Sequence, residues 1–360
     1  MRLLIAGGGT GGHVFPGLAL AERLRNENKD DEVLFVGTKR GLEAKVVPAR
    51  GFSLETVDIQ GFVGKSLGKR MLFFWLLLKS VVQSLAILRR FRPQVVLGVG
   101  GYASLPVLLA ARIRGLPYLI HEQNALPGGV NRIMGRWARR ICLSFADGAG
   151  YFPAERALVT GNPVRQGIAT CPPLPETHPR LLVFGGSQGA QALNRAVTES
   201  LPLLKERGAP LTILHQTGGE EAAAVREGYR KAGWAGVEVI PFIDDMAAAY
   251  AEAWLVVCRA GATTVAELTA SGRPAVLIPF PHAANDHQTQ NALALATAGA
   301  ALLIPQQELT AQRLAATVTE LLGDRDRLLR MSAAMASRAK PKAAEAILQE
   351  CRAAAAEKGK

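Results

Sequence analysis

The chain is poor in cysteine, and its cysteines follow no pattern. The 360 residues include only four, with no CxxC pair: Cys142, Cys171, Cys258 and Cys351. This spacing excludes a disulfide framework, disfavours a structural zinc site and is typical of a reduced, cytosolic protein. A basic n-region and a cleavage site are missing as well, because the first apolar run leads straight into glycines. We therefore expect no secretory signal peptide.

A long apolar run is also absent. The most apolar stretch, RMLFFWLLLKSVVQSLAILRRFRP, has eight apolar residues before Lys79 interrupts it, whereas a membrane span needs about 20 largely uncharged residues. The pattern favours an interfacial element whose apolar face enters lipid while its cations meet headgroups, or else a buried helix with solvated ends. The interfacial interpretation assigns a membrane patch to Lys69, Arg70, Phe73, Phe74, Trp75, Leu76 and Lys79.

Acidic residues are nearly absent from the segment that holds this stretch. Residues 65–140 contain 13 lysines and arginines but a single acid, Glu122, whereas residues 166–360 contain 19 charged residues of each sign. The whole net charge of +12 therefore lies in the first half of the chain. A localised basic excess indicates an anionic partner, which could be nucleic acid, membrane phospholipid or a phosphorylated substrate.

Short apolar runs that alternate with helical patterns predict the fold. RLLIAG, EVLFVG, QVVLGVG, YLIHE and ARRICLSF form one group, and RLLVFGG, LTILHQ, VEVIPF, WLVVCRAG and PAVLIPF form a second. Such alternation is typical of an α/β protein with parallel sheets covered on both faces. Residues 161–180 contain five prolines and are predicted to link the two groups. We predict two Rossmann-like domains, 1–162 and 163–340, that face a deep cleft.

Glycine loops open both predicted domains. Gly7, Gly9 and Gly12 satisfy G-x-G-x-x-G, but the second strand ends in Gly37 and Thr38, where a dinucleotide fold needs a ribose-binding acid. The P-loop interpretation fails too, because His13 and Val14 replace its Lys-Ser/Thr pair. The alternatives are a merely tight turn, or a loop that brings a ligand to backbone amides at a helix N-terminus. Recurrence in GGSQGA and GVGGYASLP favours the second.

Two polar clusters follow in the second half. In RAGATTVAE, Glu267 lies in the early turns of a predicted helix, where its carboxylate suits a ribose diol or simply complements the helix dipole. In HAANDHQTQN, Gln288 and Asn291 are one turn apart and face the same way. Their amides offer both donors and acceptors to the hydroxyls of a sugar.

Eight motifs in order resemble those of one family, the bacterial peptidoglycan N-acetylglucosaminyltransferases. They are GGGTGGH, GVGGYAS, HEQN, GNPVR, GGSQGA, FIDDM, RAGATTVAE and HQTQN, and they extend from residue 7 to residue 291. The resemblance implies a GT-B architecture and an inverting, metal-independent transfer without a cofactor. N-acetylglucosamine would move from UDP-N-acetylglucosamine to the 4-hydroxyl of undecaprenyl-diphospho-N-acetylmuramoyl-pentapeptide, which converts lipid I to lipid II in cell-wall synthesis. A C-terminal helix at about 341–357 would return to the first domain.

The resemblance also implies roles for particular residues. Gly101 and Tyr102 are assigned to the acceptor diphosphate, and Ile243 would meet uracil through its backbone. Glu267 would bind the ribose, and Gln288 the hydroxyls of the sugar. The donor contacts are Thr10, Gly11, Gly12, Asn124, Arg165, Ser187, Gln188, Ile243, Ala262, Thr263, Thr264, Val265, Ala266, Glu267, Gln288 and Asn291.

The chemistry needs a base for the attacking hydroxyl and donors for the leaving diphosphate. Helix N-termini and loop amides can stabilise the diphosphate without a metal. Imidazole suits proton transfer near neutral pH, so His13 is the first candidate for the base and Glu122 the second. The alternative for His13 is that it only positions the acceptor or orders the loop.

The expected partners are UDP-N-acetylglucosamine, the lipid-linked acceptor and an anionic membrane surface, with proteins of cell-wall assembly as further candidates. The expected location is the cytoplasmic face of the bacterial inner membrane, as a peripheral protein that serves cell shape and division. Three other functions stay open at this stage. They are a GT-B enzyme with another lipid acceptor such as diacylglycerol, a UDP-sugar epimerase, and a basic nucleotide- or nucleic-acid-binding module. The last is disfavoured because few aromatics are interleaved with the cations.

Overall fold

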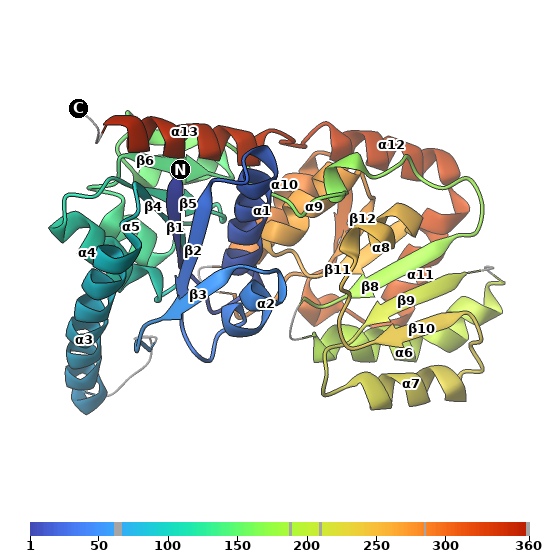
Figure 1. Ribbon diagram of the computed structural model, residues 1–360. Helices are drawn as coiled ribbons and strands as arrows, with labels where there is room; N and C mark the ends of the chain where they lie inside the picture. Colours follow the sequence, from blue (N-terminus) through green and yellow to red (C-terminus); the bar gives the residue numbers. More distant parts are fainter. Residues whose placement is uncertain (61–66, 187–188, 209–210, 284–285, 358–360) are drawn as a thin grey trace. The chain divides into compact units, whose positions relative to one another are not determined.

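The computed structural model divides the chain into two compact units. Unit 1 contains Met1–Val164 and Pro341–Lys360, and unit 2 contains Arg165–Lys340 (Figure 1). The structure describes residues 1–60, 67–186, 189–208, 211–283 and 286–357, and among them it describes no side chain within residues 67–73. Both units are α/β, so the prediction of two parallel-sheet domains is confirmed.

Unit 1 is built on a seven-stranded parallel sheet in the order β3-β2-β1-β4-β5-β6-β7. The strands are β1 (Arg2–Gly7), β2 (Glu32–Gly37), β3 (Ser53–Thr56), β4 (Val95–Gly100), β5 (Tyr118–Glu122), β6 (Arg140–Leu143) and β7 (Ala157–Val159). The helices are α1 (Gly11–Glu27), α2 (Glu43–Ala49), α3 (Leu67–Phe91), α4 (Ser104–Ile113), α5 (Gly129–Met134) and α13 (Ala343–Glu357). Every residue of β4 and β5 is buried, as expected for central strands covered on both faces.

Unit 2 repeats this architecture with a six-stranded parallel sheet in the order β10-β9-β8-β11-β12-β13. The strands are β8 (Arg180–Phe184), β9 (Thr212–Gln216), β10 (Val237–Ile240), β11 (Leu255–Cys258), β12 (Ala275–Leu277) and β13 (Ala301–Leu303). The helices are α6 (Gln191–Glu206), α7 (Ala222–Lys231), α8 (Met246–Glu252), α9 (Ala262–Ser271), α10 (His287–Thr297), α11 (Ala311–Gly323) and α12 (Arg325–Ala336).

The strands that the sequence analysis missed are short and lie at sheet edges. β3, β7 and β13 lie at sheet edges and are three or four residues long. Each pairs with only one neighbour, so its sequence carries little of the burial pattern that marks a central strand.

Two segments pack differently from a simple linker or tail. Much of the proline-rich segment 161–180 packs on unit 2, where Ile168 and Leu174 are buried. Helix α13 packs against α1, with Ile347, Leu348 and Cys351 buried in the core of unit 1 (Figure 1).

Each unit buries one histidine on a central strand. His121 on β5 accepts a hydrogen bond from the Gln123 amide at Nδ1 (3.0 Å) and lies 3.3 Å from the Gly161 carbonyl at Nε2. His215 on β9 bridges the Tyr229 hydroxyl and the Asn194 amide oxygen, both at 3.1 Å. Burial lowers the pKa of His121 to about 4 and that of His215 to about 3. Both rings are therefore neutral in the folded protein at neutral pH.

These two rings predict that the fold loses stability as pH falls below the ordinary histidine pKa of 6.5. Both folded pKa values lie below the ordinary value of 6.5, so the unfolded chain takes up the protons first as pH falls. The stabilisation from each neutral, buried histidine is complete above the ordinary pKa and is lost as pH falls from there to the folded pKa. At about pH 5 the loss in unfolding free energy is about 2 kcal/mol per histidine. Urea unfolding of wild type and His215→Gln at about pH 7 and about pH 5 measures this.

The expected result is that His215→Gln is less stable at neutral pH but loses about 2 kcal/mol less than wild type on acidification. His178→Asn is the matched control, because that ring is exposed and its loss leaves the pH dependence unchanged. An equal acid sensitivity of wild type and His215→Gln contradicts the prediction.

Candidate active site

Both sheets reverse their strand order at a point where ligands bind in open α/β folds. In unit 1 the order reverses between β1 and β4, and in unit 2 between β8 and β11. Loops that follow these strands leave toward opposite faces of the sheet and open a crevice at its carboxyl edge. The glycines Gly7–Gly9 of unit 1, and Gly185, Gly186 and Gly189 of unit 2, lie at or just after the ends of β1 and β8, at such points, so each unit carries a candidate half-site of its own.

The glycines of the first loop serve different neighbours. A Cβ atom on Gly7 would lie 2.6 Å from the Gly100 carbonyl oxygen, and one on Gly11 would lie 3.0 Å from the Phe15 ring. These two glycines permit close packing within the protein. Around Gly9 and Gly12, by contrast, a Cβ atom would meet nothing closer than 3.7 Å. The open side of the loop is therefore at Gly9 and Gly12, and the sequence alone could not separate these two sets.

Gly8 makes room for a side chain that the sequence analysis missed. The carboxylate of Glu43, the first residue of α2, lies under the loop and is 1% exposed. It accepts hydrogen bonds from the Gly9 N–H, the Thr38 N–H and the Thr38 hydroxyl, each at 2.8 Å. The available signal was the pair Gly37 and Gly41 on either side of Thr38, whose Cβ atoms would also clash with this carboxylate.

The imidazole of His13 packs on the backbone that follows β4. A Cβ atom on Gly100 would lie 2.9 Å from the ring, and one on Gly101 would lie 3.5 Å from Nδ1. Both glycines have φ values in the left-handed region, +94° and +78°, which other residues rarely adopt. The Thr10 hydroxyl lies 3.2 Å from His13 Nδ1. If Nδ1–H donates to that hydroxyl, Nε2 carries the lone pair that a base needs.

The amino end of α1 beside this ring is suited to an anion. The residues described there include no side chain that caps the helix and no acid in its first turn. Half-buried Gly11 and Gly12 belong to that turn, and helix-terminal amides favour negative charge. The Tyr102 ring lies across the loop, 3.8 Å from the position of a Cβ atom on Gly9, and is 36% exposed.

Glu122 is buried and fully engaged. One carboxylate oxygen accepts from the Asn124 N–H at 2.9 Å, and the other accepts from the Gly128 N–H at 3.0 Å and the Asn131 amide at 2.8 Å. Its side chain is 2% exposed. The carboxylate therefore holds the loop that carries Asn124, and this geometry favours His13 over Glu122 as the base.

The second half-site begins at the loop after β8. Ser187 and Gln188 lie outside the described residues. Gly189 packs on the backbone of Thr217, where a Cβ atom would clash, whereas a Cβ atom on Gly186 would meet no atom of the described residues within 4 Å. Across the switch point, α9 begins at Ala262 after Gly261, and among the described residues no side chain caps it. The sequence-predicted donor residues Ala262, Thr263, Thr264, Val265 and Ala266 form its first turns.

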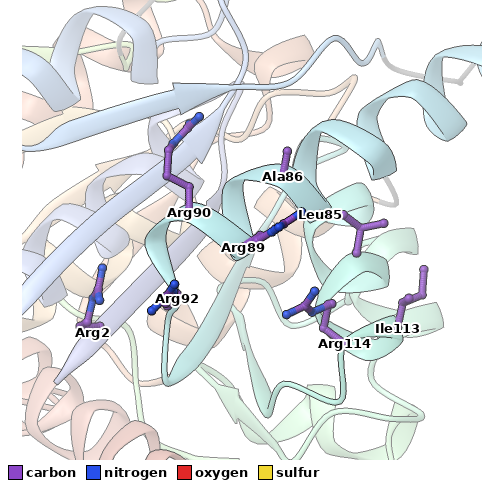
Figure 2. Close-up of a pocket in the computed structure, with 8 residues that line it drawn as sticks. All are labelled: Arg2, Leu85, Ala86, Arg89, Arg90, Arg92, Ile113 and Arg114. Atoms are coloured by element: carbon purple, nitrogen blue, oxygen red, sulfur yellow. The ribbon is translucent and has the colours of Figure 1, made fainter.

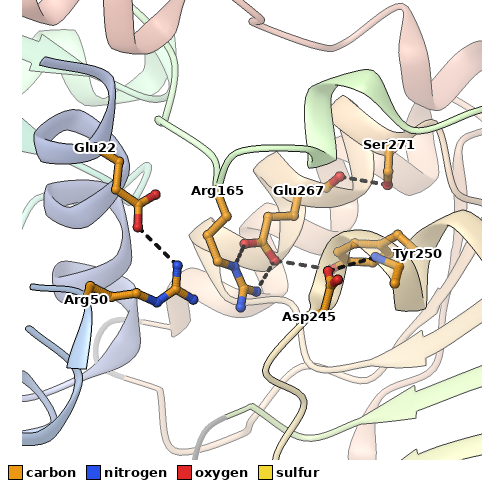
Figure 3. Close-up of polar contacts among 8 residues, drawn as sticks. Glu22, Arg50, Arg165, Asp245, Tyr250, Glu267 and Ser271 are labelled. Carbon is orange, nitrogen blue, oxygen red and sulfur yellow. Dashed lines mark hydrogen bonds and ion pairs between the residues drawn. The ribbon is translucent and has the colours of Figure 1, made fainter. Parts of the chain in front are cut away.

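Glu267 on α9 is held by an ion pair. Arg165 binds both carboxylate oxygens, with Nε–Oε1 at 2.7 Å and Nη2–Oε2 at 2.9 Å, and the Tyr250 hydroxyl donates to Oε2 at 3.3 Å (Figure 3). Glu267 is 2% exposed and the Arg165 side chain 15%. Burial raises the pKa of Tyr250 well above its usual value, so the phenol remains a donor. The carboxylate predicted to bind a ribose is thus paired with Arg165 in this structure.

The other sequence-predicted residues of unit 2 differ in how far they are buried. Half-buried Gln288 accepts from the Phe280 N–H at 3.0 Å through Oε1. Asn291 is 1% exposed and donates to the Ala260 carbonyl at 3.0 Å, so it supports the turn before α9 from behind. Ile243 has a buried side chain, and within the described part of the chain no hydrogen bond uses its backbone N–H or C=O.

Helix α3 presents an apolar stripe. Phe74, Trp75, Leu78 and Val82 are 64%, 67%, 58% and 60% exposed. Leu76 is half-buried, and Lys79 pairs with Asp58 at 2.8 Å. The side chains of Lys69, Arg70 and Phe73 lie outside the described ones. Among the helices as far as they are described, none is long and apolar enough to cross a membrane.

A basic groove lies at the carboxyl-terminal end of α3 (Figure 2). Its volume is about 800 Å³, and five of the eight residues that line it are arginines. In the described part of the chain, Arg89, Arg92 and Arg114 form no ion pair with a carboxylate. The lining residues are Arg2, Leu85, Ala86, Arg89, Arg90, Arg92, Ile113 and Arg114. The exposed stripe of α3 therefore leads into a groove suited to anions.

The described residues include no group of three or more His, Cys, Asp or Glu side chains that could hold a metal ion.

The chain matches both domains of one family. The glycosyltransferase family 28 N-terminal domain matches residues 3–143, and the glycosyltransferase family 28 C-terminal domain matches residues 180–347. A protein of Syntrophotalea carbinolica named UDP-N-acetylglucosamine--N-acetylmuramyl-(pentapeptide) pyrophosphoryl-undecaprenol N-acetylglucosamine transferase is 55% identical over 98% of each chain. A relative of the same name from Anaeromyxobacter sp. (strain Fw109-5) is 48% identical over 98% of this chain and 93% of its own.

Solved structures agree with this match. The crystal structure of Acinetobacter baumannii MurG superimposes with a TM-score of 0.77 at 35% identity, covering 98% of this chain and 99% of that one. A UDP-N-acetylglucosamine 2-epimerase superimposes with a TM-score of 0.69, but at 15% identity this likeness concerns the fold alone.

Proposed function

Because the chain belongs to glycosyltransferase family 28, we propose that it transfers N-acetylglucosamine from UDP-N-acetylglucosamine to the 4-hydroxyl of undecaprenyl-diphospho-N-acetylmuramoyl-pentapeptide. The resemblance drawn from the motifs is confirmed by the match to both family domains. The observation that carries the proposal is the 55% identity to a transferase of this name over 98% of both chains. The product is lipid II, and the pathway is peptidoglycan synthesis.

The proposed mechanism assigns the chemistry of the acceptor to unit 1. His13 takes the proton of the 4-hydroxyl as that oxygen attacks the anomeric carbon and UDP leaves from the opposite face. The packing of the ring on Gly100 and Gly101 supports this role, because it fixes the imidazole beside the uncapped end of α1. Gly101 and Tyr102 would contact the acceptor diphosphate, and Thr10, Gly11, Gly12 and Asn124 the donor.

The proposed donor site lies on unit 2. The unused backbone groups of Ile243 suit the polar edge of uracil, and Gln288 suits the sugar hydroxyls. Arg165, the described amides of the loop after β8 and the start of α9 would carry the charge of the leaving diphosphate without a metal. Ser187 and Gln188 would contribute there as well.

Donor binding would change the partner of Arg165. Its guanidinium occupies both oxygens of Glu267, which a ribose diol needs as acceptors. Arginine also binds phosphate in a bidentate manner. We therefore propose that the ribose replaces Arg165 on Glu267 and that the freed guanidinium moves onto the diphosphate.

The proposed location is the cytoplasmic face of the bacterial inner membrane, with α3 against the lipid. The exposed residues Phe74, Trp75 and Leu78 would enter the interface, and the basic groove would face anionic headgroups (Figure 2). An acceptor with a polyprenyl tail stays in the membrane, so the enzyme must approach it there. Proteins of cell-wall assembly and cell division are further proposed partners.

A transfer assay tests the function. Radiolabelled N-acetylglucosamine is expected to move from its UDP donor to the lipid-linked muramoyl-pentapeptide, at the same rate with and without EDTA. His13→Gln keeps a polar side chain but removes the base, so kcat should fall by about 10²- to 10⁴-fold. No transfer by the wild-type protein would sink the proposed function, and a His13→Gln variant of near-native kcat would reject the base alone.

A comparison of uridine with UDP tests the exchange of Arg165. Arg165→Met is expected to weaken UDP binding by at least about tenfold, since a charge-assisted contact is lost, while uridine binds as well as or better than before. Glu267→Gln should weaken both ligands. The dissociation constants are measured by calorimetry or NMR titration, with 2′-deoxyuridine as the control for the diol. Equal losses for uridine and UDP in Arg165→Met would mean that the arginine only positions Glu267.

Vesicle sedimentation tests the membrane surface. The triple variant Phe74→Ser, Trp75→Ser, Leu78→Ser should lower the partition onto anionic vesicles by about tenfold or more, because each side chain loses apolar burial. Wild-type binding should also weaken with salt. Leu293→Ser with Leu329→Ser is the matched control, since both are exposed leucines of unit 2. Undiminished binding of a folded triple variant contradicts the assignment.

A further inference from the structure

The Glu43 carboxylate is buried among three glycines from separate segments of unit 1. A Cβ atom built on Gly8, Gly37 or Gly41 would lie within 3.0 Å of this side chain. The three residues belong to the first glycine loop, to the end of β2 and to the turn before α2. A single carboxylate thus explains the absence of a side chain at three positions.

This carboxylate has donors but no cation. Its three hydrogen bonds come from the Gly9 N–H and from the N–H and hydroxyl of Thr38. In the described part of the chain, no lysine, arginine or histidine forms an ion pair with it. A buried charge without a counter-ion is costly unless hydrogen bonds to the charged form hold it. If Glu43 served only to fill space in the core, burying its carboxylate would cost free energy, and an apolar side chain would stabilise the fold more.

The bond to Gly9 leads directly to the reactive ring. Gly9 precedes Thr10, which begins α1 and whose hydroxyl lies 3.2 Å from His13 Nδ1. The Gly9 backbone has a φ of +93°, so nothing in ordinary chain preference fixes it there. In the described part of the chain, the Gly9–Glu43 bond is the one hydrogen bond that ties this amide to another element. The Thr10 carbonyl accepts from the His13 and Val14 N–H groups, so this residue stays attached to α1. Loss of the Gly9 bond would instead release the other side of Thr10, and with it the placement of the hydroxyl that contacts the imidazole.

We propose that Glu43 is a positioning residue for the transfer reaction: its carboxylate holds the backbone of Gly9 and thereby sets Thr10 and His13. This inference rests on the proposed function. It adds a residue that contacts neither donor nor acceptor. The ribose-binding acid of a dinucleotide fold is missing at the end of β2, and the nearby acid Glu43 binds the protein's own glycine loop instead of a ribose.

Glu43→Gln tests the proposal because the two side chains have nearly the same shape. Both carboxylate oxygens face only donors, so the amide NH₂ must oppose either Gly9 or Thr38. Keeping the two Thr38 bonds is favoured, and the Gly9 bond is then lost. We expect kcat for transfer to fall by about 10- to 100-fold, as for a small misplacement of a reacting group. The Kd for uridine, whose proposed contacts Ile243 and Glu267 both lie on unit 2, should change by less than twofold.

Thr38→Val is the matched control within the same cluster. It removes one donor from the carboxylate but leaves the Gly9 bond intact, so kcat should stay within about threefold of wild type. Thermal unfolding of each variant reports whether the fold is kept. If Glu43→Gln retains native kcat, or if kcat and uridine affinity fall together, the positioning role is rejected.

Gly41→Ala decides the question if Glu43→Gln does not fold. Its methyl group would overlap the carboxylate without removing it, and its backbone is not in the left-handed region. We expect Gly41→Ala to lower kcat as Glu43→Gln does, because the displaced carboxylate would lose its contact with the Gly9 N–H. A folded Gly41→Ala variant of native kcat would overturn the proposal. A wild-type protein without transfer activity would instead reject the proposed function.

Discussion

The close approach of two loops at the sheet switch point is the constraint on which the first half-site depends. Gly7 must pass within contact of the Gly100 carbonyl, and Gly101 within contact of Gly8. This crowding brings the amino end of α1 and the backbone after β4 together, and the His13 ring fills the space between them. The same strand reversal in unit 2 brings the loop after β8 beside α9. The positions of both half-sites therefore follow from sheet topology before any particular side chain is considered.

The fold was predictable because its central strands are buried on both faces and read as apolar runs. β4 and β5 show this, whereas the edge strands β3 and β7 do not. The site was predictable only in part. The sequence placed Glu267 on an early turn of a helix. It could not show that Arg165, which lies 102 residues earlier in the chain, binds the Glu267 carboxylate. Such a pairing depends on how the strands are ordered, and spacing along the chain carries no record of it.

The glycines illustrate the limit most clearly. A run of glycines indicates that something comes close to the backbone, yet it does not say what. For Gly7 the neighbour is another strand, for Gly8 it is the Glu43 carboxylate, and for Gly11 it is the Phe15 ring. Only tertiary packing distinguishes these from Gly9 and Gly12. Asn291 shows a similar limit for a polar side chain. Its amide was predicted to meet the hydroxyls of a sugar, but it is buried and donates to the Ala260 carbonyl.

Three buried carboxylates of the two half-sites differ in what neutralises them, and this difference separates rigid parts from exchangeable ones. Glu43 and Glu122 are held mainly by backbone N–H groups, with one hydroxyl and one side-chain amide, all within unit 1. Breaking those bonds would leave a buried charge unsatisfied, so both loops stay fixed. Glu267 is held mainly by a guanidinium on a long side chain, and that cation binds a phosphate as readily as a carboxylate. An incoming ligand that supplies both a diol and a diphosphate satisfies the two partners at once. Exchange without an unpaired charge is therefore possible at Glu267 and excluded at Glu43 and Glu122.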